Sequence, residues 1–291
     1  MPTPLKLNDS IENIYSTCID NKFIFLNLEK SFKNQIDWNY ADYGKLWTYN
    51  LTYFEYLKER EDITFIYDFI EHIESVKDGL EPFPISLRGL SWIKFLTKFH
   101  IEDKKIDDSL YAQYYILLDN LEYHLLGNHL LENGFSLLFG AYYFKDETLY
   151  NKANEILKEE LDEQILEDGG HFELSPMYHQ LMLFRVLDSI NLLQNNAWNK
   201  QELLELLTSK AEVMLGWLKN ISYKNGDIPL LNDSTNHIAP TSKELFDYAD
   251  KLNIHIQTIT LKESGYKKIQ KANCELIVDI GDIYEYSYRV F

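Results

Sequence analysis

Apolar residues recur at helical spacing along most of the chain. Between Leu46 and Leu57 they fall at i, i+3, i+4 and i+7, and charged residues 58–60 follow them. The same spacing predicts further helices over residues 87–96, 108–126, 129–143, 148–166, 176–194, 200–217 and 242–252. Several of these segments are apolar on more than one face and are separated by short turns. This pattern predicts a mainly α protein with helices in two layers, either an α-solenoid or an (α/α) toroid.

The ends of the chain and two helix starts carry their own signals. Residues 22–28 predict a short strand or a buried extended segment, and residues 254–261, 265–270 and 274–281 predict strands. Ser86 is expected to cap a helix after the breaker sequence at 78–84, and Pro176 to open one after Ser175. The expected organisation is a helical domain over residues 1–253 and the first strands of an incomplete β-domain over 254–291.

Charge and composition exclude several classes of function. The chain has 28 basic and 46 acidic residues among 291, a net charge of −18, which argues against a nucleic-acid partner or an anionic membrane surface. Its 2 cysteines are too few for a disulfide framework or a Cys-rich zinc site. The sequence has no secretory leader, membrane span, phosphate loop or dinucleotide turn, so we expect a cytoplasmic chain without metal or cofactor.

Two polar clusters lie in the first half of the chain. Arg88 is flanked by apolar residues on a predicted helix, so it needs either a structural acid or an anionic ligand as its partner. Asn128, His129 and Glu132 share neighbouring helical positions in an apolar segment. Such a cluster is stable when its members bond each other in a core network or bind a ligand, and both alternatives stay open.

Two more clusters lie in the second half. In residues 168–179, a glycine pair is followed by His171, Glu173, Tyr178 and His179. The last two fall in a first helical turn, where an anion is favoured. Residues 226–234 end in an Asn-Asp-Ser cluster around Asp233 that also suits a helix cap. Together these residues favour acid–base chemistry, and the 21 Tyr, 16 Phe and 5 Trp offer rings for sugars.

Six segments together resemble the heparinase II/III-like polysaccharide lyases. They occur in the family's order across nearly the whole chain, at residues 37–39, 45–57, 84–95, 127–133, 168–179 and 232–234. The resemblance implies an incomplete (α/α) toroid followed by an antiparallel β-sandwich. It also implies cleavage of uronic-acid polysaccharides or glycosaminoglycans by β-elimination.

That reaction needs a group that neutralises the uronate carboxylate, a base for the proton beside it, and an acid for the leaving oxygen. By resemblance, Asn128 or His129 is the neutraliser and Tyr178 is the base, the acid or both. We expect substrate-binding or supporting roles for seven further residues: Arg88, Glu132, Glu173, His179, Trp47, Trp92 and Asp233.

Other functions and partners stay open at this point. A glycoside hydrolase would need two facing carboxylates from among Glu132, Glu173, Asp168 and Asp233, and a carbohydrate-binding scaffold would need no acid–base set. The family's β-domain brings a further catalytic His after a strand like residues 276–283, where this chain has Tyr284–Phe291. A separately encoded β-domain is therefore one partner to consider, beside the acidic polysaccharide. Family members are usually periplasmic or secreted, unlike the location expected from the sequence.

Overall fold

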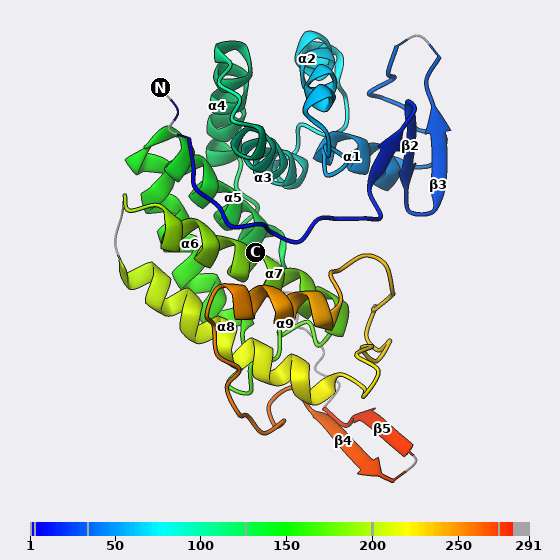
Figure 1. Cartoon of the computed structure of the whole chain (residues 1–291), viewed down its shortest axis with the longest axis vertical. Coiled ribbons are helices and arrows are strands. Elements are labelled where there is room, and N and C mark those ends of the chain that lie inside the picture. Colours follow the sequence, from blue (N-terminus) through cyan, green and yellow to red (C-terminus); the bar gives the residue numbers. More distant parts are fainter. Residues whose placement is uncertain are drawn as a thin grey trace. The chain divides into compact units, whose positions relative to one another are not determined.

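The computed structural model describes residues 2, 4–33, 35–125, 127–198, 201–272 and 274–281. The chain divides into two compact units. Unit 1 comprises Met1–Lys158 and Asn191–Lys200, and unit 2 comprises Glu159–Ile190 and Gln201–Phe291. Figure 1 shows helices dominating both. None of the helices in these described ranges is long and apolar enough to cross a membrane.

Unit 1 opens with a small antiparallel sheet, β1 (Thr17–Ile19), β2 (Lys22–Phe25) and β3 (Leu28–Ser31), in that order (Figure 1). The strand expected at residues 22–28 is thus the central strand and its turn. Alternation along β2 buries Phe23 and Phe25 on one face. Their ring centroids lie 5.1 Å from Tyr56 and 5.1 Å from Trp47, so the sheet closes one side of an aromatic core.

The first helix is shorter than expected, and the second was not expected at all. α1 spans Lys45–Tyr53 and stops because Phe54 is left-handed at φ 61°. Buried Phe54 stacks on Trp38 at 5.5 Å and on Tyr56 at 5.5 Å, contacts that compensate for this unusual backbone. α2 spans Ile63–His72 and buries Ile66 and Phe69, which lie at helical spacing. Short 3₁₀ turns, Arg60–Asp62 and Ile73–Ser75, flank it.

Four longer helices complete most of unit 1: α3 (Pro82–Phe99), α4 (Lys104–Asp119), α5 (His129–Phe144) and the first part of α6 (Glu147–Gln164). The expectation that Ser86 caps α3 is wrong. Helix α3 begins at Pro82 because a first-turn proline lacks only an N–H that would have no partner there. Ser86 is buried inside the helix, and its carbonyl accepts a hydrogen bond from Ser136 Oγ of α5 at 2.9 Å.

Unit 2 contains most of α7 (Pro176–Asn195), α8 (Gln201–Ile221), α9 (Ser242–Lys251) and the hairpin β4 (Tyr266–Lys271)–β5 (Cys274–Asp279). The prediction of a strand at residues 254–261 is wrong. That segment is irregular and lies against α8, because the Gln257 N–H donates to the Glu212 carbonyl at 3.1 Å. The other two expected strands form the hairpin. Tyr284–Phe291 lies outside the described residues, and a β-domain beginning at residue 254 stays a prediction.

Candidate functional site

The amino-terminal end of α5 carries two of the three proposed catalytic residues. Asn128 is the N-cap residue and His129 is the first helical residue, after Gly127 at φ 87°. The helix dipole and the free N–H groups of the first turn make this end of the helix electropositive, which suits a carboxylate ligand. The sequence segment 127–133 therefore places its polar residues at one helix end and its apolar residues in the core.

A buried carboxylate, Glu122, holds the side chains behind this helix end. His129 Nδ1 lies 3.2 Å from Glu122 Oε1, and Asn133 Nδ2 donates to Glu122 Oε2 at 3.0 Å. Asn133 Oδ1 accepts from the Glu122 N–H at 3.1 Å, and Asn133 Nδ2 also reaches Ser86 Oγ at 3.1 Å. The core-network alternative therefore holds for Asn133, and the His129 ring is anchored to an acid.

Asn128 differs from these anchored residues. Asn128 is 8% exposed, and its side-chain amide makes no hydrogen bond to any part of the chain that the structure describes. Glu132 is buried on the first turn of α5. Its amide nitrogen and oxygen are not fully buried, so the Asn128 side chain is available for a ligand at this helix end.

Arg88 has its partners in the interior of unit 1. Its Nε donates to Gln113 Oε1 at 2.6 Å, and its Nη1 donates to the carbonyls of Thr52 at 3.1 Å and Gly79 at 2.9 Å. The guanidinium also lies over the Phe69 ring at 4.7 Å. Burial lowers the pKa of Arg88 to about 9. Neither expected partner, acid or anionic ligand, is bonded to it within the described ranges, and Arg88 acts by tying the end of α1 to the loop at Gly79.

The two tryptophans proposed for substrate binding or support lie in the aromatic core. Trp47 and Trp92 are both fully buried. Trp47 Nε1 donates to the Leu28 carbonyl at 3.3 Å, and Trp92 packs edge-on against Phe54 at 5.3 Å. Because no ring face is exposed, neither tryptophan can stack on a sugar, and only the supporting role remains for them.

In unit 2, the start of α7 positions Tyr178. Ser175 Oγ accepts from the Tyr178 N–H at 3.3 Å, and Ser234 Oγ accepts from the Met177 N–H at 3.2 Å. The two serine hydroxyls are 3.0 Å apart. The predicted opening of a helix at Pro176 is confirmed, and the 232–234 cluster is a helix cap as anticipated. Tyr178 thus extends from a first turn that is fixed by two caps.

The surroundings of Tyr178 keep its phenol protonated. Partial burial raises the pKa of Tyr178, and the carboxylates of Asp233 and Glu173 raise it further. The hydroxyl makes no hydrogen bond to another described residue, so it is available to a ligand. The first-turn position favours an anion, but burial and the two acids outweigh it. The arrangement is that of a proton donor rather than of a resting phenolate.

Asp168 and the glycine pair form a junction between residues 168–170 and residues 262–264 of unit 2. Asp168 Oδ2 accepts from the N–H groups of Lys262 at 2.9 Å and Ser264 at 3.0 Å, and from Ser264 Oγ at 2.6 Å. Asp168 Oδ1 accepts from the Gly170 N–H at 3.2 Å. Gly169 has φ +87°, and a Cβ there would lie 2.2 Å from the Val213 carbonyl. Asp168 is thus fully used as a structural carboxylate.

The two histidines of segment 168–179 are neutral core residues. His171 Nε2 bonds Gln164 Oε1 at 3.0 Å, and His179 Nε2 bonds the Met214 carbonyl at 3.1 Å. Burial lowers the pKa of each imidazole to about 3. His179 also lies against Trp217, with ring centroids 4.4 Å apart. A nearby histidinium therefore does not stabilise a Tyr178 phenolate within unit 2, and His179 is placed to support the helix from inside.

Sequence reasoning missed Glu122 and the contacts of Asn232. Asn232 Nδ2 donates to the Leu174 carbonyl at 3.1 Å, Tyr266 Oη at 3.1 Å and Asp279 Oδ2 at 2.8 Å. These contacts tie the Asp233 loop to the hairpin. Glu122 stands in a polar stretch between two helices, where nothing in the pattern marks it as buried. In the described ranges, no group of three or more His, Cys, Asp or Glu side chains is arranged to hold a metal ion.

Known proteins match both the sequence and the fold. A heparin-sulfate lyase from Bacteroides stercoris is 26% identical over 179 residues, 60% of this chain and 25% of that protein. A crystal structure of heparinase III matches 77% of this chain and 39% of its own, with a TM-score of 0.54 and 18% identity. The structure of the heparinase III-BT4657 gene product matches 77% of this chain and 42% of its own, with a TM-score of 0.51 and 18% identity. At this identity the structures show a shared fold, which confirms the mainly α, (α/α) toroid class.

The chain spans a quarter of that lyase and about two fifths of the two solved chains. Its own residues 93–255, more than half of its length, match the Heparinase II/III N-terminus family. This match includes α5, the Asp168 junction and Tyr178, and it confirms the resemblance inferred from the motifs. The chain therefore belongs to the Heparinase II/III N-terminus family.

Proposed function

We propose that this protein is a polysaccharide lyase that cleaves a uronic-acid-containing glycosaminoglycan by β-elimination. The observation that carries the proposal is the Tyr178 hydroxyl, which is half-buried, unbonded within the described chain and kept protonated by its surroundings. Family membership and the names of the relatives, heparin-sulfate lyase and heparinase III, support the same reaction and substrate class.

The uronate carboxylate is assigned to Asn128. β-Elimination removes the proton on the carbon next to the carboxylate, and the negative charge that develops spreads onto the carboxylate oxygens. The Asn128 amide is available, and it lies at the electropositive end of α5. His129 is the alternative, but its Nδ1 is engaged by Glu122 at 3.2 Å, which leaves Nε2 for a ligand.

Tyr178 is assigned to the proton transfers. As the electron pair from the broken C–H bond forms a C=C bond, the glycosidic C–O bond breaks and the leaving oxygen takes a proton. The proton of the broken C–H bond passes to solvent water, a neutral Tyr178 protonates the leaving oxygen, and the resulting phenolate regains its proton from water before the next turnover. Glu173 and Asp233 keep the phenol neutral between turnovers because a phenolate beside two carboxylates is unfavourable.

The test uses the full chain, a panel of uronic-acid polysaccharides and near-ultraviolet absorbance, which detects the conjugated double bond that elimination creates. We expect a rise for wild type, no rise for Tyr178→Phe, and an unchanged rise for Tyr223→Phe, a half-buried tyrosine of unit 2 that serves as the matched control. Asn128→Ala should lower turnover by at least ~100-fold, the usual loss for one donor to a developing anion.

Other outcomes identify the alternative functions. New reducing ends without absorbance would indicate a glycoside hydrolase, because hydrolysis creates no double bond. Binding of polysaccharide without either product would indicate a carbohydrate-binding scaffold. Equal activity of Tyr178→Phe and wild type would remove Tyr178 from the chemistry and overturn the proposal.

A further inference from the structure

A row of aromatic rings runs from α1 to the start of α5 within unit 1. The ring centroids of Tyr49 and Tyr53 are 6.2 Å apart, those of Tyr53 and Phe83 are 6.2 Å apart, and those of Phe83 and His129 are 4.6 Å apart. Tyr49, Phe83 and His129 are all partly exposed, whereas Tyr53 is 7% exposed. The row thus ends beside Asn128, the residue assigned to the uronate.

Two polar groups at this row have no protein partner in the part of the chain that the structure describes. They are the Tyr53 hydroxyl and the Asn128 amide, on residues that are 7% and 8% exposed. Neither group is fully buried, so each can meet a ligand from the surface. An aromatic core would not need such groups, whereas a ligand that carries hydroxyl and carboxylate oxygens would satisfy both.

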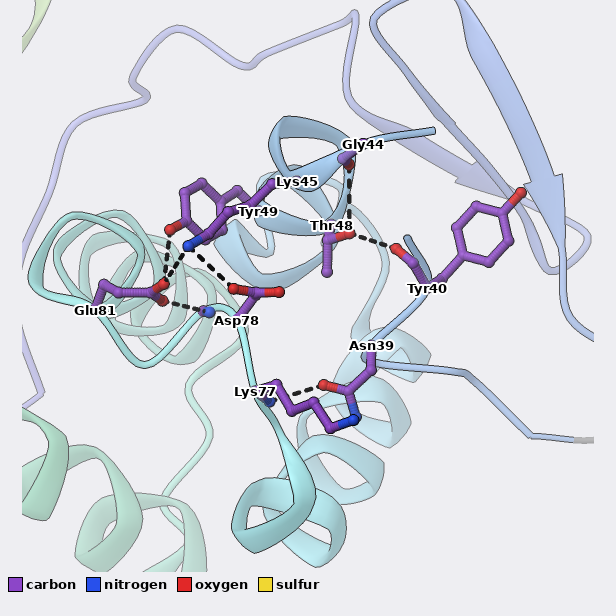
Figure 2. A network of polar contacts seen from close by, with 10 residues as sticks. Asn39, Tyr40, Gly44, Lys45, Thr48, Tyr49, Lys77, Asp78 and Glu81 are labelled. Atoms are coloured by element: carbon purple, nitrogen blue, oxygen red, sulfur yellow. Dashed lines mark hydrogen bonds and ion pairs between the residues drawn. The ribbon is translucent and has the colours of Figure 1, made fainter. Parts of the chain in front are cut away.

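A polar network holds the far end of the row, as Figure 2 shows. The Tyr49 hydroxyl donates to Glu81 Oε1 at 2.7 Å, and Lys45 Nζ lies 2.9 Å from Glu81 and 3.0 Å from Asp78. The Gly79 N–H donates to Glu81 Oε2 at 2.6 Å. These bonds fix Tyr49 while leaving Lys45 and both carboxylates partly exposed. Carboxylates accept from sugar hydroxyls and an ammonium donates to them.

From this arrangement we propose that Tyr49, Tyr53 and Phe83 form a saccharide subsite next to the uronate position, which takes an uncharged sugar ring of the polysaccharide. The sugar lies on the partly exposed ring of Tyr49, beside Lys45 Nζ at 5.1 Å from the ring centroid, with its hydroxyls on Lys45, Asp78 and Glu81. A sulfated ring is disfavoured there because it would face two carboxylates that Lys45 only partly compensates. The subsite rests on the proposed function, since it assumes a polysaccharide substrate, and it extends the site along the chain of the sugar.

The test measures binding by calorimetry to the full chain with Tyr178→Phe, which prevents cleavage of the probes. The probes are free glucuronic acid and an unsulfated hexasaccharide of alternating glucuronic acid and N-acetylglucosamine. We expect Tyr49→Ala to weaken hexasaccharide binding about tenfold, the loss typical of an aromatic anchor. It should leave the binding of glucuronic acid unchanged, because a single sugar is too short to occupy both positions.

Two variants serve as controls. Tyr49→Phe keeps the ring and should weaken binding less than about threefold. Tyr111→Ala removes a more exposed tyrosine of α4 whose hydroxyl also donates to a carboxylate, that of Asp146, and it should have no effect. Equal melting temperatures will show that Tyr49→Ala remains folded, and Tyr49→Phe tests the subsite should the alanine variant unfold.

The two hypotheses fail in different ways. Hexasaccharide binding that Tyr49→Ala leaves unchanged would overturn the subsite while the lyase function stands. A loss of the same size for glucuronic acid and hexasaccharide would also overturn it, since Tyr49 would then act on the uronate position. Absence of both binding and cleavage of any uronic-acid polysaccharide would overturn the proposed function, and the subsite with it.

Discussion

The imidazole of His129 is bound to the carboxylate of Glu122, with Nδ1 3.2 Å from Oε1. The same carboxylate accepts a hydrogen bond from Asn133, so one buried acid holds both side chains of the α5 start in place. Asn128, their neighbour at the helix end, is left with an available amide. The His129 imidazole is therefore anchored by a protein acid, whereas the Asn128 amide is available to bind a carboxylate of a ligand.

Removing Glu122 should destabilise unit 1. In Glu122→Ala, the buried Asn133 amide loses an acceptor and His129 loses its anchor, so we expect the free energy of unfolding to fall by about 1–3 kcal/mol. Urea denaturation measures this loss. Glu155→Ala breaks the exposed Lys152–Glu155 pair and should change the free energy by no more than ~0.5 kcal/mol. Equal effects of the two variants would contradict the anchoring role.

Removing Asp233 should make the Tyr178 phenol more acidic. The Asp233 carboxylate raises the pKa of Tyr178, after burial, so Asp233→Asn removes one repulsive charge and lowers the pKa toward its ordinary value. Nuclear magnetic resonance of ring-labelled tyrosine, with Tyr178→Phe to assign the signal, follows this change. Asp227→Asn, at another exposed loop position of unit 2, should leave the signal unchanged. An unchanged or higher pKa in Asp233→Asn would remove the electrostatic argument.

The two buried histidines of unit 2 should make it sensitive to acid. In the folded state the pKa of His171 and of His179 is about 3, below the ~6.5 of an unfolded chain, so the unfolded state binds more protons in between. The free energy of unfolding is therefore highest above pH ~6.5, and it decreases as the pH falls toward 3. At pH 4.5 each histidine should cost roughly 2–3 kcal/mol relative to neutral pH.

His179→Phe tests this expectation, because it keeps a ring against Trp217 and removes the titrating group. The difference in unfolding free energy between neutral pH and pH 4.5 should shrink in this variant. The matched change His255→Gln, at an exposed position of unit 2, should leave that difference as it is in wild type. The same acid sensitivity in all three proteins would assign the effect to other groups.

Gly169 should tolerate no side chain. Gly169 and Gly226 both have positive φ, at +87° and +92°, but a Cβ would lie 2.2 Å from the Val213 carbonyl at Gly169 and in open space at Gly226. Gly226→Ala should therefore cost only the backbone strain of about 1–2 kcal/mol. Gly169→Ala should cost clearly more, because α8 must also move, and thermal melts of the two variants measure the difference. Similar melting temperatures would show that the junction can yield.

Local signals in the sequence predicted much of what surrounds Tyr178. Ser175 followed by Pro176 predicts the start of α7, and the 232–234 cluster predicts a helix cap, which Ser234 provides at the start of α7. Both signals act over a few residues, through backbone dihedrals and side-chain bonds to free N–H groups. Where neighbours far along the chain decide, these signals fail. Ser86 resembles a cap but is buried under Ser136, and Phe54 ends α1 because a pocket of aromatic rings receives it.

Helical periodicity and six ordered motifs were enough to predict the fold class and the family. Which residues are available for chemistry depends on how distant parts of the chain pack together. Trp47, Trp92 and His179 are buried, Asp168 is saturated by hydrogen bonds, and Arg88 is held by carbonyl and amide groups. Burial and pairing depend on residues distant in sequence, such as Gln113 for Arg88 and Ser264 for Asp168. Periodicity and short motifs report only on neighbours along the chain, so they do not contain that information.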